Sequence, residues 1–229
     1  MCAARTAAIL PEPTPDYDRS CRRCPRLASF LDVVKRENPA YWCLPVPPFG
    51  PIGAPLLIVG LAPGMHGANA TGRAFTGDYA GILLYETLHD FGFASAPVAT
   101  SRGDGLALSG CRISNAVKCL PPANKPLPLE VATCSRYLAV DIAALPPGAA
   151  VLALGRIAHE AVVRLAGAPL RAHPFAHGAR HAIGPEALAL FDSYHCSRYN
   201  TNTGRLTRSM FRAVFRDVAA HLGRSAPAR

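Results

Sequence analysis

The sequence predicts a single α/β domain with a central, mostly parallel sheet of four strands and helices on both faces. Short aliphatic runs bounded by Pro or Gly alternate along the chain with amphipathic segments, as expected of buried parallel strands and the helices that cover them. At 229 residues, half of them hydrophobic, the chain can bury one substantial core. We expect this domain over residues 21–222, with a flexible proline-containing tail at 1–20 and a short C-terminal tail at 223–229.

The first expected strand is the run Leu56-Leu57-Ile58-Val59, which lies between Pro55 and Gly60. The four expected strands are 56–59, 111–117, 150–154 and 188–194. Helical spacing of apolar residues predicts helices at 25–37, 80–92, 128–145, 156–166 and 207–222. Ligands of such folds bind at the carboxyl ends of the strands, so the loops after Val59, around Asn115 and after Tyr194 are candidate site loops.

Charge and cysteine usage restrict the partners and the compartment. With 24 Lys and Arg against 15 Asp and Glu, the net charge is +9, which indicates a polyanionic partner. The charge-free stretch 38–66 contains too many prolines for a membrane-spanning helix, and the apolar run before Pro11 is too short for a secretory signal. We therefore expect a monomeric cytoplasmic protein without a membrane segment and with reduced thiols.

Four of the eight cysteines form two pairs along the chain. Cys21 and Cys24 make a C-x2-C pair, and Cys119 and Cys134 make a second, wider pair. If they converge, four thiolates fit either a tetrahedral zinc or an iron–sulfur cluster, and spacing does not choose between them. The alternative is that Cys119 and Cys134 are buried as small apolar residues.

The first two candidate loops carry residues that suit a flat, polar ligand. Glycines at 60–67 let backbone amides approach an anion or a ring, although a plain tight turn explains them equally well. Phe75 is a core residue or a stacking platform, and Asp78 an N-cap or an acid. Asn115 at a strand end can donate and accept hydrogen bonds at once, so it could pair with one edge of an amide-like heterocycle. The alternative is that it caps a turn.

The third loop, 193–207, is unusually polar for a segment between a strand and a terminal helix. His195 at the strand end suits hydrogen bonding to a developing anion. Arginines in and after this loop have no neighbouring run of acidic residues, which favours phosphate contacts over a solvated helix face. These arginines are Arg198, Arg205, Arg208, Arg212 and Arg216.

Three motifs together resemble those of the uracil-DNA glycosylases of family 5, the type B, iron–sulfur branch. They are G-L-A-P-G-x-H-G-x-N-x-T-G-R-x-F-T-G-D at 60–78, N-x-V-K-C at 115–119 and H-x-S-x-Y-N-T-x-T-G-R-L-T at 195–207. The resemblance extends from Cys21 to the terminal helix. It implies a DNA repair enzyme that flips uracil, and by extension other deaminated bases such as hypoxanthine, out of the duplex and hydrolyses its N-glycosidic bond. Such an enzyme would associate with the nucleoid when bound to DNA.

The resemblance also implies a role for each matching residue. Phe75 would stack on the flipped base, Asn115 would face its pairing edge, His195 would hydrogen-bond the base oxygen that gains charge, and Asp78 would assist cleavage. Gly60, Ala62 and Gly64 would complete the base site. Arg198, Tyr199, Arg205 and Arg208 would contact DNA. Cys21, Cys24, Cys119 and Cys134 would hold a [4Fe–4S] cluster, with zinc as the less favoured occupant.

Two positions qualify the expectation. Ala62 stands where better-known uracil glycosylases keep a water-activating Asp or Asn, so a strong general base is missing there. Cys196 stands where the family usually has proline, which loosens the backbone after His195. The alternatives are a non-catalytic, zinc-stabilised nucleic-acid-binding module and a nucleotide-binding enzyme that acts on small molecules.

Overall fold

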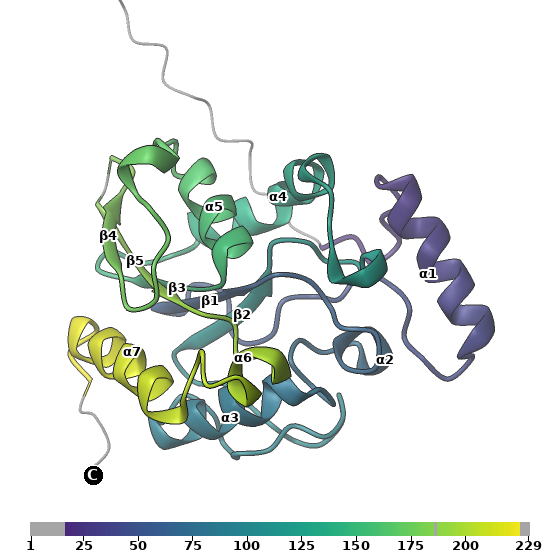
Figure 1. Cartoon of the computed structure of the whole chain (residues 1–229), viewed down its shortest axis with the longest axis horizontal. Coiled ribbons are helices and arrows are strands. Elements are labelled where there is room, and N and C mark those ends of the chain that lie inside the picture. Colours follow the sequence, from purple (N-terminus) through teal and green to yellow (C-terminus); the bar gives the residue numbers. More distant parts are fainter. Residues whose placement is uncertain (1–16, 186, 225–229) are drawn as a thin grey trace, which may run out of the picture.

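The computed structural model describes residues 17–185 and 187–224 (Figure 1). Most of the predicted N-terminal tail, residues 1–16, and most of the C-terminal tail, residues 225–229, lie outside the described residues. The described chain forms one α/β domain around a five-stranded sheet of order β2-β1-β3-β5-β4. None of its helices is long and apolar enough to cross a bilayer.

Four of the strands run parallel and correspond to the four that the sequence predicts. They are β1 (Leu56–Gly60), β2 (Cys111–Asn115), β3 (Ala150–Leu154) and β5 (Leu188–Ser193). Every residue of β1 and β3 is buried, as their uninterrupted aliphatic runs require. The predicted fold class is therefore confirmed.

The fifth strand, β4 (Arg180–Ile183), was not expected. It pairs antiparallel with β5 at the edge of the sheet, and of its residues only Ile183 is buried. A short edge strand with one buried side chain leaves no aliphatic run in the sequence, which explains why it was missed.

The five predicted helices are present, with ends within two residues of those expected: α1 (Pro25–Glu37), α3 (Tyr79–Asp90), α4 (Pro128–Ala143), α5 (Arg156–Leu165) and α7 (Arg208–His221). Two short helices, α2 (Ala68–Thr71) and α6 (Arg198–Asn202), were not predicted, and single 3₁₀ turns lie at Pro122–Asn124 and Leu170–Ala172.

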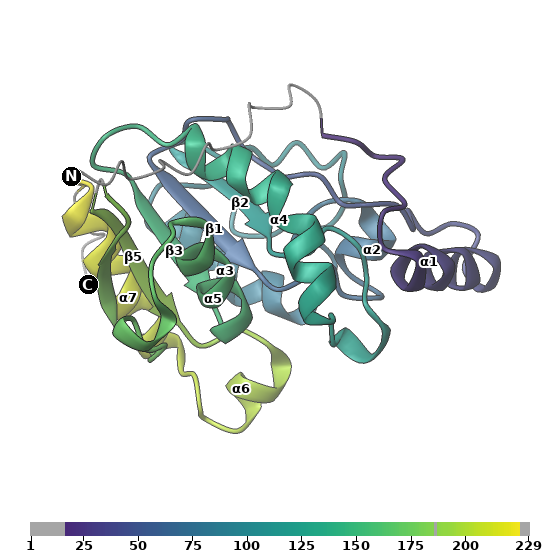
Figure 2. The same ribbon diagram turned by 90° about the horizontal axis from the view of Figure 1, so that it is seen from above.

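Two hydrophobic cores lie on opposite faces of the sheet. Helices α3 and α7 cover one face, where they pack on alternate strand residues such as Leu56 and Ile58. Helices α4 and α5 cover the other, where they pack on Leu57 and Val59 (Figures 1 and 2). This alternation follows from the two-residue period of a strand.

Helix α1 lies outside this three-layer arrangement, beyond the β2 side of the sheet (Figures 1 and 2). Its Leu27 is fully buried and packs with Val117 and Cys134, in the segments after β2 and in α4. Pro25 in its first turn and Lys35 and Arg36 in its last turn fit the preferences of helix ends. The N-terminal cysteine segment is thereby held against the loop that follows β2.

Candidate active site

A cavity of about 330 Å³ opens where the carboxyl ends of the strands meet. The strand register brings this about, because Gly60 at the end of β1 pairs with Asn115 at the end of β2. The cavity is lined by residues of all three predicted loops: Leu61, Ala62, Gly64, Ala68, Phe75, Asp78, Ala80, Asn115, Asn124, His195 and Ser197. Its volume is in the range of small-molecule sites.

Phe75 forms one aromatic wall of this cavity and holds a strained backbone conformation. Its φ is +53°, in the left-handed region that non-glycine residues seldom adopt. A side chain on Gly81 is excluded, because its Cβ would lie 1.9 Å from the Phe75 carbonyl oxygen. The Phe75 and His195 rings stack with centroids 5.8 Å apart and planes inclined by 27°. Backbone strain at a site wall is typical of functional positions.

Asn115 offers a buried polar atom that could bind a ligand. The residue is 4% exposed, and its side-chain oxygen Oδ1 is buried without a hydrogen-bond partner among the described residues. Gly60 makes room for this amide, since a Cβ there would lie 2.4 Å from Oδ1 and 2.7 Å from Cζ of Phe75. Gly60 therefore lies under the site and shapes it without lining the cavity. An unpaired buried amide oxygen is costly unless a ligand satisfies it.

His195 follows β5, and a hydrogen bond to its backbone carbonyl fixes its position. Asn200 Nδ2 donates to the His195 carbonyl oxygen at 2.8 Å, and the Ser197 side chain caps α6 just beyond. Burial lowers the pKa of His195 to about 4, so its ring is neutral at physiological pH and carries one N–H donor. Within the described residues, no hydrogen bond engages either ring nitrogen.

Asp78 combines the structural and the chemical role considered for it. Its Oδ1 accepts from the Gly81 N–H at 2.9 Å, which makes it the N-cap of α3. Its other oxygen faces the glycine loop, where a Cβ on Gly67 would come within 2.5 Å. Burial raises the pKa of Asp78, while the backbone hydrogen bonds from Gly81 and Ala80 oppose the shift.

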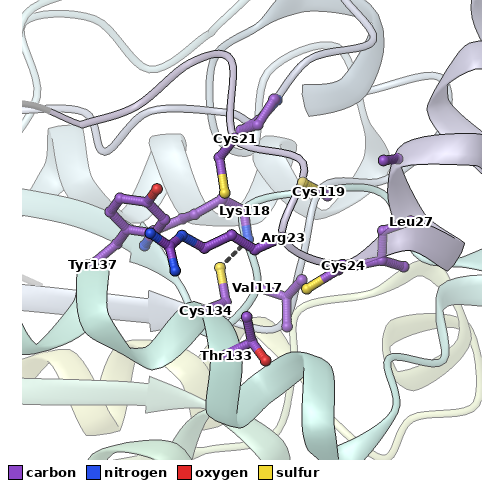
Figure 3. A pocket seen from close by; sticks show the side chains of 12 residues that line it. Cys21, Arg23, Cys24, Leu27, Val117, Lys118, Cys119, Thr133, Cys134 and Tyr137 are labelled. Atoms are coloured by element: carbon purple, nitrogen blue, oxygen red, sulfur yellow. Dashed lines mark hydrogen bonds between the residues drawn. The ribbon is translucent and has the colours of Figure 1, made fainter.

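The four paired cysteines converge at a second place, next to α1 (Figure 3). Figure 3 shows the side chains of Cys21, Cys24, Cys119 and Cys134 turned toward a common space beside Tyr137. Burial, and after it the charges of the neighbouring thiolates, raises the pKa of Cys24 and Cys119. Four thiols that line one pocket are a donor set that could hold a metal ion or cluster, which would take them as thiolates.

Lys118 links this cysteine group to Asn115. Its side chain is 1% exposed, and its ammonium donates to the Asn115 carbonyl oxygen at 2.7 Å and to Ser114 Oγ. Ser114 in turn donates to Asp141, which also forms an ion pair with Arg112. The Lys118 backbone N–H donates to Cys134 Sγ at 3.2 Å (Figure 3).

The same loops connect the two sites by packing. Ala62, which lines the cavity, also packs on the cluster of Leu27, Val117 and Cys134. Asn124, which lies between Cys119 and Cys134, reaches the cavity from a turn in which its φ is +55°. A group bound by the four cysteines would therefore also restrain Ala62 and Asn124, which line the cavity.

Basic and aromatic side chains gather beside the cavity mouth around α6, which follows the lining residue Ser197. The guanidinium of Arg198 lies over the ring of Tyr79, at 5.1 Å, and that of Arg205 over Tyr194, at 4.5 Å. Tyr199 is 71% exposed.

The expectation that these arginines lack acidic partners is wrong for two of them. Arg208 and Arg212 on α7 form ion pairs with Glu86 and Asp90 on α3. The partners are over 100 residues away in sequence, so only the packing of α3 on α7 reveals them. The Arg208 side chain nevertheless remains 61% exposed.

The predicted base-site residues line one cavity, except Gly60, which lies beneath it. The four predicted cysteines line a second pocket, and Arg198 and Tyr199 lie in α6, directly after the lining residue Ser197. Sequence reasoning missed Asn124, Ser197 and the burial of Lys118. The turn-forming run Pro121-Pro122-Ala123-Asn124 was visible, but nothing in it shows that the turn closes over a cavity.

Comparison with known proteins decides the family. The family model for the uracil DNA glycosylase superfamily matches residues 47–219. The chain belongs to this superfamily. It is 46% identical to the type-5 uracil-DNA glycosylase of Thermus thermophilus over 87% of this chain and 92% of the relative. It is 42% identical to the type-5 enzyme of Pyrobaculum aerophilum, over 89% of this chain and 90% of the relative.

More distant relatives are the type-4 uracil-DNA glycosylases, of which that of Thermotoga maritima is 31% identical over 61% of this chain and 59% of the relative. Cys196, where the motif resemblance led us to expect proline, is fully buried in the core that α3 and α7 cover. Packing of its thiol there, together with the Asn200 hydrogen bond to His195, supplies a restraint that the sequence did not show.

Proposed function

We propose that this protein removes uracil from DNA by hydrolysing the bond between the base and deoxyribose, which leaves an abasic site. The observation that carries the proposal is the unpaired Asn115 oxygen, buried at a cavity that Phe75 and His195 also line. A base flipped out of the duplex brings a flat ring and a polar edge to such a cavity, at an unpairing cost of a few kcal/mol that is lowest at mismatches.

The three side chains suit three different parts of uracil. The Phe75 ring offers a face for stacking, and the Asn115 amide offers an acceptor for the ring N–H and a donor for a carbonyl. Neutral His195 offers an N–H to the carbonyl oxygen that gains charge as the bond breaks. One such donor typically contributes ~10²–10³ in rate.

The reaction also needs stabilisation of the sugar, which gains positive charge as the base leaves. Asp78 is the carboxylate of the cavity and supplies the opposite charge, or orients the water whose oxygen bonds to the sugar carbon. The water proton and the electron pair of the broken bond then leave with the base. Ala62 offers no such group, so we assign no strong general base to its position.

We further propose that Cys21, Cys24, Cys119 and Cys134 hold a [4Fe–4S] cluster. The donor set of four thiols fits it, and so does their spacing. Tetrahedral zinc with Zn–S bonds of about 2.3 Å would bring the sulfur atoms to about 3.8 Å from one another. No three of the four cysteine sulfur atoms lie within 4.8 Å of one another, since the one such group of ligand atoms among the described residues contains no cysteine. This wider spacing favours a cluster over a single zinc ion. When bound, the cluster would supply a structural crosslink between α1 and the loop after β2.

DNA contact is assigned to the surface around α6. Arg198, Arg205 and Arg208 would bind backbone phosphates, and exposed Tyr199 would fill the vacated stack. The protein would act as a monomer in the cytoplasm, at the nucleoid. Binding should weaken steeply as salt rises, and Arg198→Ala should reduce the slope by about one counterion. A small-molecule nucleotide enzyme would show little salt dependence.

The test of the activity is release of free uracil from a uracil-containing duplex. The wild-type protein is expected to release it, and Asp78→Asn to do so ~10²–10⁴ times more slowly. Binding of the same duplex without release would favour the non-catalytic, zinc-stabilised binding module, particularly if the purified protein is colourless and contains zinc.

Substrate breadth is a separate proposal. The apolar wall at Ala62 and a volume of about 330 Å³ leave room for hypoxanthine, which has a second ring. Duplexes that differ only in the lesion should show release of hypoxanthine as well as uracil. Activity confined to uracil would mean that the walls close around the smaller base.

A further inference from the structure

Three side chains outside the cavity, two of them buried and one partly buried, point their ligand atoms at one another. They are His159 in the first turn of α5, His181 in β4 and Asp192 in β5, and these atoms all lie within 4.8 Å of each other. His159 Nδ1 is 2.8 Å from Asp192 Oδ1, and His181 Nε2 is 3.2 Å from Asp192 Oδ2. Their side chains are 1%, 11% and 0% exposed, in that order.

The hydrogen bonds of His159 show that a positive charge belongs in this group. Its Nε2 lies 2.8 Å from the carbonyl oxygen of His173, which can only accept, so Nε2 carries a hydrogen. In the neutral ring Nδ1 then has a lone pair, and this lone pair would face a carboxylate oxygen at 2.8 Å. Such a contact is repulsive unless a cation lies between the two atoms.

The burial of Asp192 also indicates that a positive charge belongs in this group. It is fully buried, and no lysine or arginine of the described residues forms an ion pair with it. Both of its oxygens face imidazole nitrogens instead. A buried carboxylate without a permanently charged partner is costly, so the group needs either a proton on an imidazole or a bound cation. Although burial of the ring opposes the shift, the hydrogen bond and charge of Asp192 raise the pKa of His159, which shows that the group favours a positive charge.

We propose that His159 Nδ1, His181 Nε2 and the Asp192 carboxylate bind a divalent ion of the zinc class. Imidazole nitrogens and one carboxylate are ligands that zinc prefers, at about 2.0–2.2 Å, which places neighbouring ligand atoms about 3.3 Å apart in a tetrahedron. The two nitrogen–oxygen separations, 2.8 and 3.2 Å, lie within 0.5 Å of this value, and all the ligand atoms lie within 4.8 Å of one another. The His159 hydrogen bond to His173 is the outer contact that commonly orients a ligating histidine.

The proposed ion would connect the edge of the sheet to the segment that precedes His195. Asp192 stands three residues before His195 in the chain, and β4, β5 and α5 meet at this end of the sheet (Figure 1). A fourth ligand position would be left for water. This site is independent of the glycosylase activity and of the cysteine group, since it shares no ligand with either.

The test is a calorimetric titration of the purified protein, its iron content intact, with zinc chloride. One zinc ion per chain is expected, and X-ray absorption at the zinc edge should show nitrogen and oxygen neighbours without sulfur. His181→Gln, at the more exposed end of the group, should weaken zinc binding at least ~10-fold, the minimum typical of losses even in outer contacts. His89→Gln, at an exposed position of α3, is the matched control and should bind zinc like the wild type.

Thermal unfolding keeps the test decisive if a variant is unstable. Zinc should raise the melting temperature of the wild type and of His89→Gln but not that of His181→Gln. Absence of zinc binding in the wild type would overturn the proposal and identify the missing charge as a proton on His159. A sulfur shell around the zinc, or equal binding by His181→Gln, would overturn it as well.

Discussion

Individual residues of the cavity are placed by glycines that allow no side chain. Gly60 lies against both Asn115 and Phe75, and Gly67 against Asp78. Each glycine thus lets a functional side chain occupy the volume that a Cβ would take. Close approach, rather than backbone flexibility, is the physical reason for glycine at these two positions.

Gly60→Ala tests this placement. The added Cβ would lie 2.4 Å from Asn115 Oδ1 and 2.7 Å from Cζ of Phe75, so both groups must move. We expect uracil release to fall ~10²-fold, the cost that shifts of about 1 Å have in catalytic sites. Single-turnover kinetics measures this loss. Gly103→Ala, where nothing lies within 4 Å, is the control, and equal rates for the two variants would contradict the placement.

His195 predicts a pH dependence of stability. Burial lowers its pKa from 6.5 to about 4, so between these values the unfolded chain binds a proton that the folded chain does not. The free energy of unfolding therefore falls as the pH falls from 6.5 to 4 and changes no further below pH 4. The upper limit of this loss is about 3 kcal/mol, and the measured loss should be smaller because the ring is only half-buried. Urea unfolding of the wild type and His195→Asn should show a steeper decline for the wild type, and parallel curves would argue against a neutral His195.

At the scale of elements, the loops around the site are anchored by ion pairs that the sequence does not show. Arg73 is buried and binds both carboxylate oxygens of Asp104, at 2.8 and 2.6 Å, and also Thr76. Asp104 also accepts the backbone N–H groups of Thr100 and Leu106. Arg73 therefore joins the loop that carries Phe75 to the loop before β2, so this motif arginine serves the fold and not DNA.

Arg73→Met is expected to cost about 3 kcal/mol, since it leaves a largely buried carboxylate without its partner. Surface ion pairs usually contribute little to stability, but the Arg73 and Asp104 side chains are only 5% and 13% exposed, and so this pair should contribute more. Chemical denaturation measures the loss. Arg102→Met, which removes an exposed guanidinium stacked on Trp42, should cost no more than about 1 kcal/mol, and a similar cost for both variants would count against this anchoring role.

Long elements with strong periodicity were predictable, and short elements that depend on a neighbour were not. The runs that became β1 and β3 and the stripe of α7 carry their own pattern. Strand β4 exists only by pairing with β5, and α6 depends on the Ser197 cap and on contacts of Tyr79 with Arg198 and Asn202. Such partners are distant in sequence, so periodicity cannot reveal them.

At the scale of the whole molecule, the cysteine group and the cavity form one connected unit through Lys118, Ala62 and Asn124. The convergence of the candidate loops was predictable, because the carboxyl ends of parallel strands share one edge of the sheet. The connection itself was not, since a lysine that bonds the Asn115 carbonyl from a fully buried position looks like any surface lysine in the sequence.

Loss of the cluster should therefore loosen the cavity. In Cys21→Ser/Cys24→Ser we expect iron to be lost and hydrogen exchange to accelerate in α1 and in residues 117–134, while β3 and β5 remain protected. Mass spectrometry of exchange measures this. Cys111→Ala, a buried core cysteine outside the group, should keep its iron, and unchanged exchange at 117–134 in the double variant would disprove the connection.

The most direct measurement is a crystal structure of Asp78→Asn bound to a duplex with one uracil. We predict that the uracil lies in the cavity, its face on Phe75 and its polar edge on the Asn115 amide, with a carbonyl oxygen within hydrogen-bond distance of His195. A well-ordered complex in which the uracil remains stacked in the duplex, or binds away from these three side chains, would contradict the proposed function.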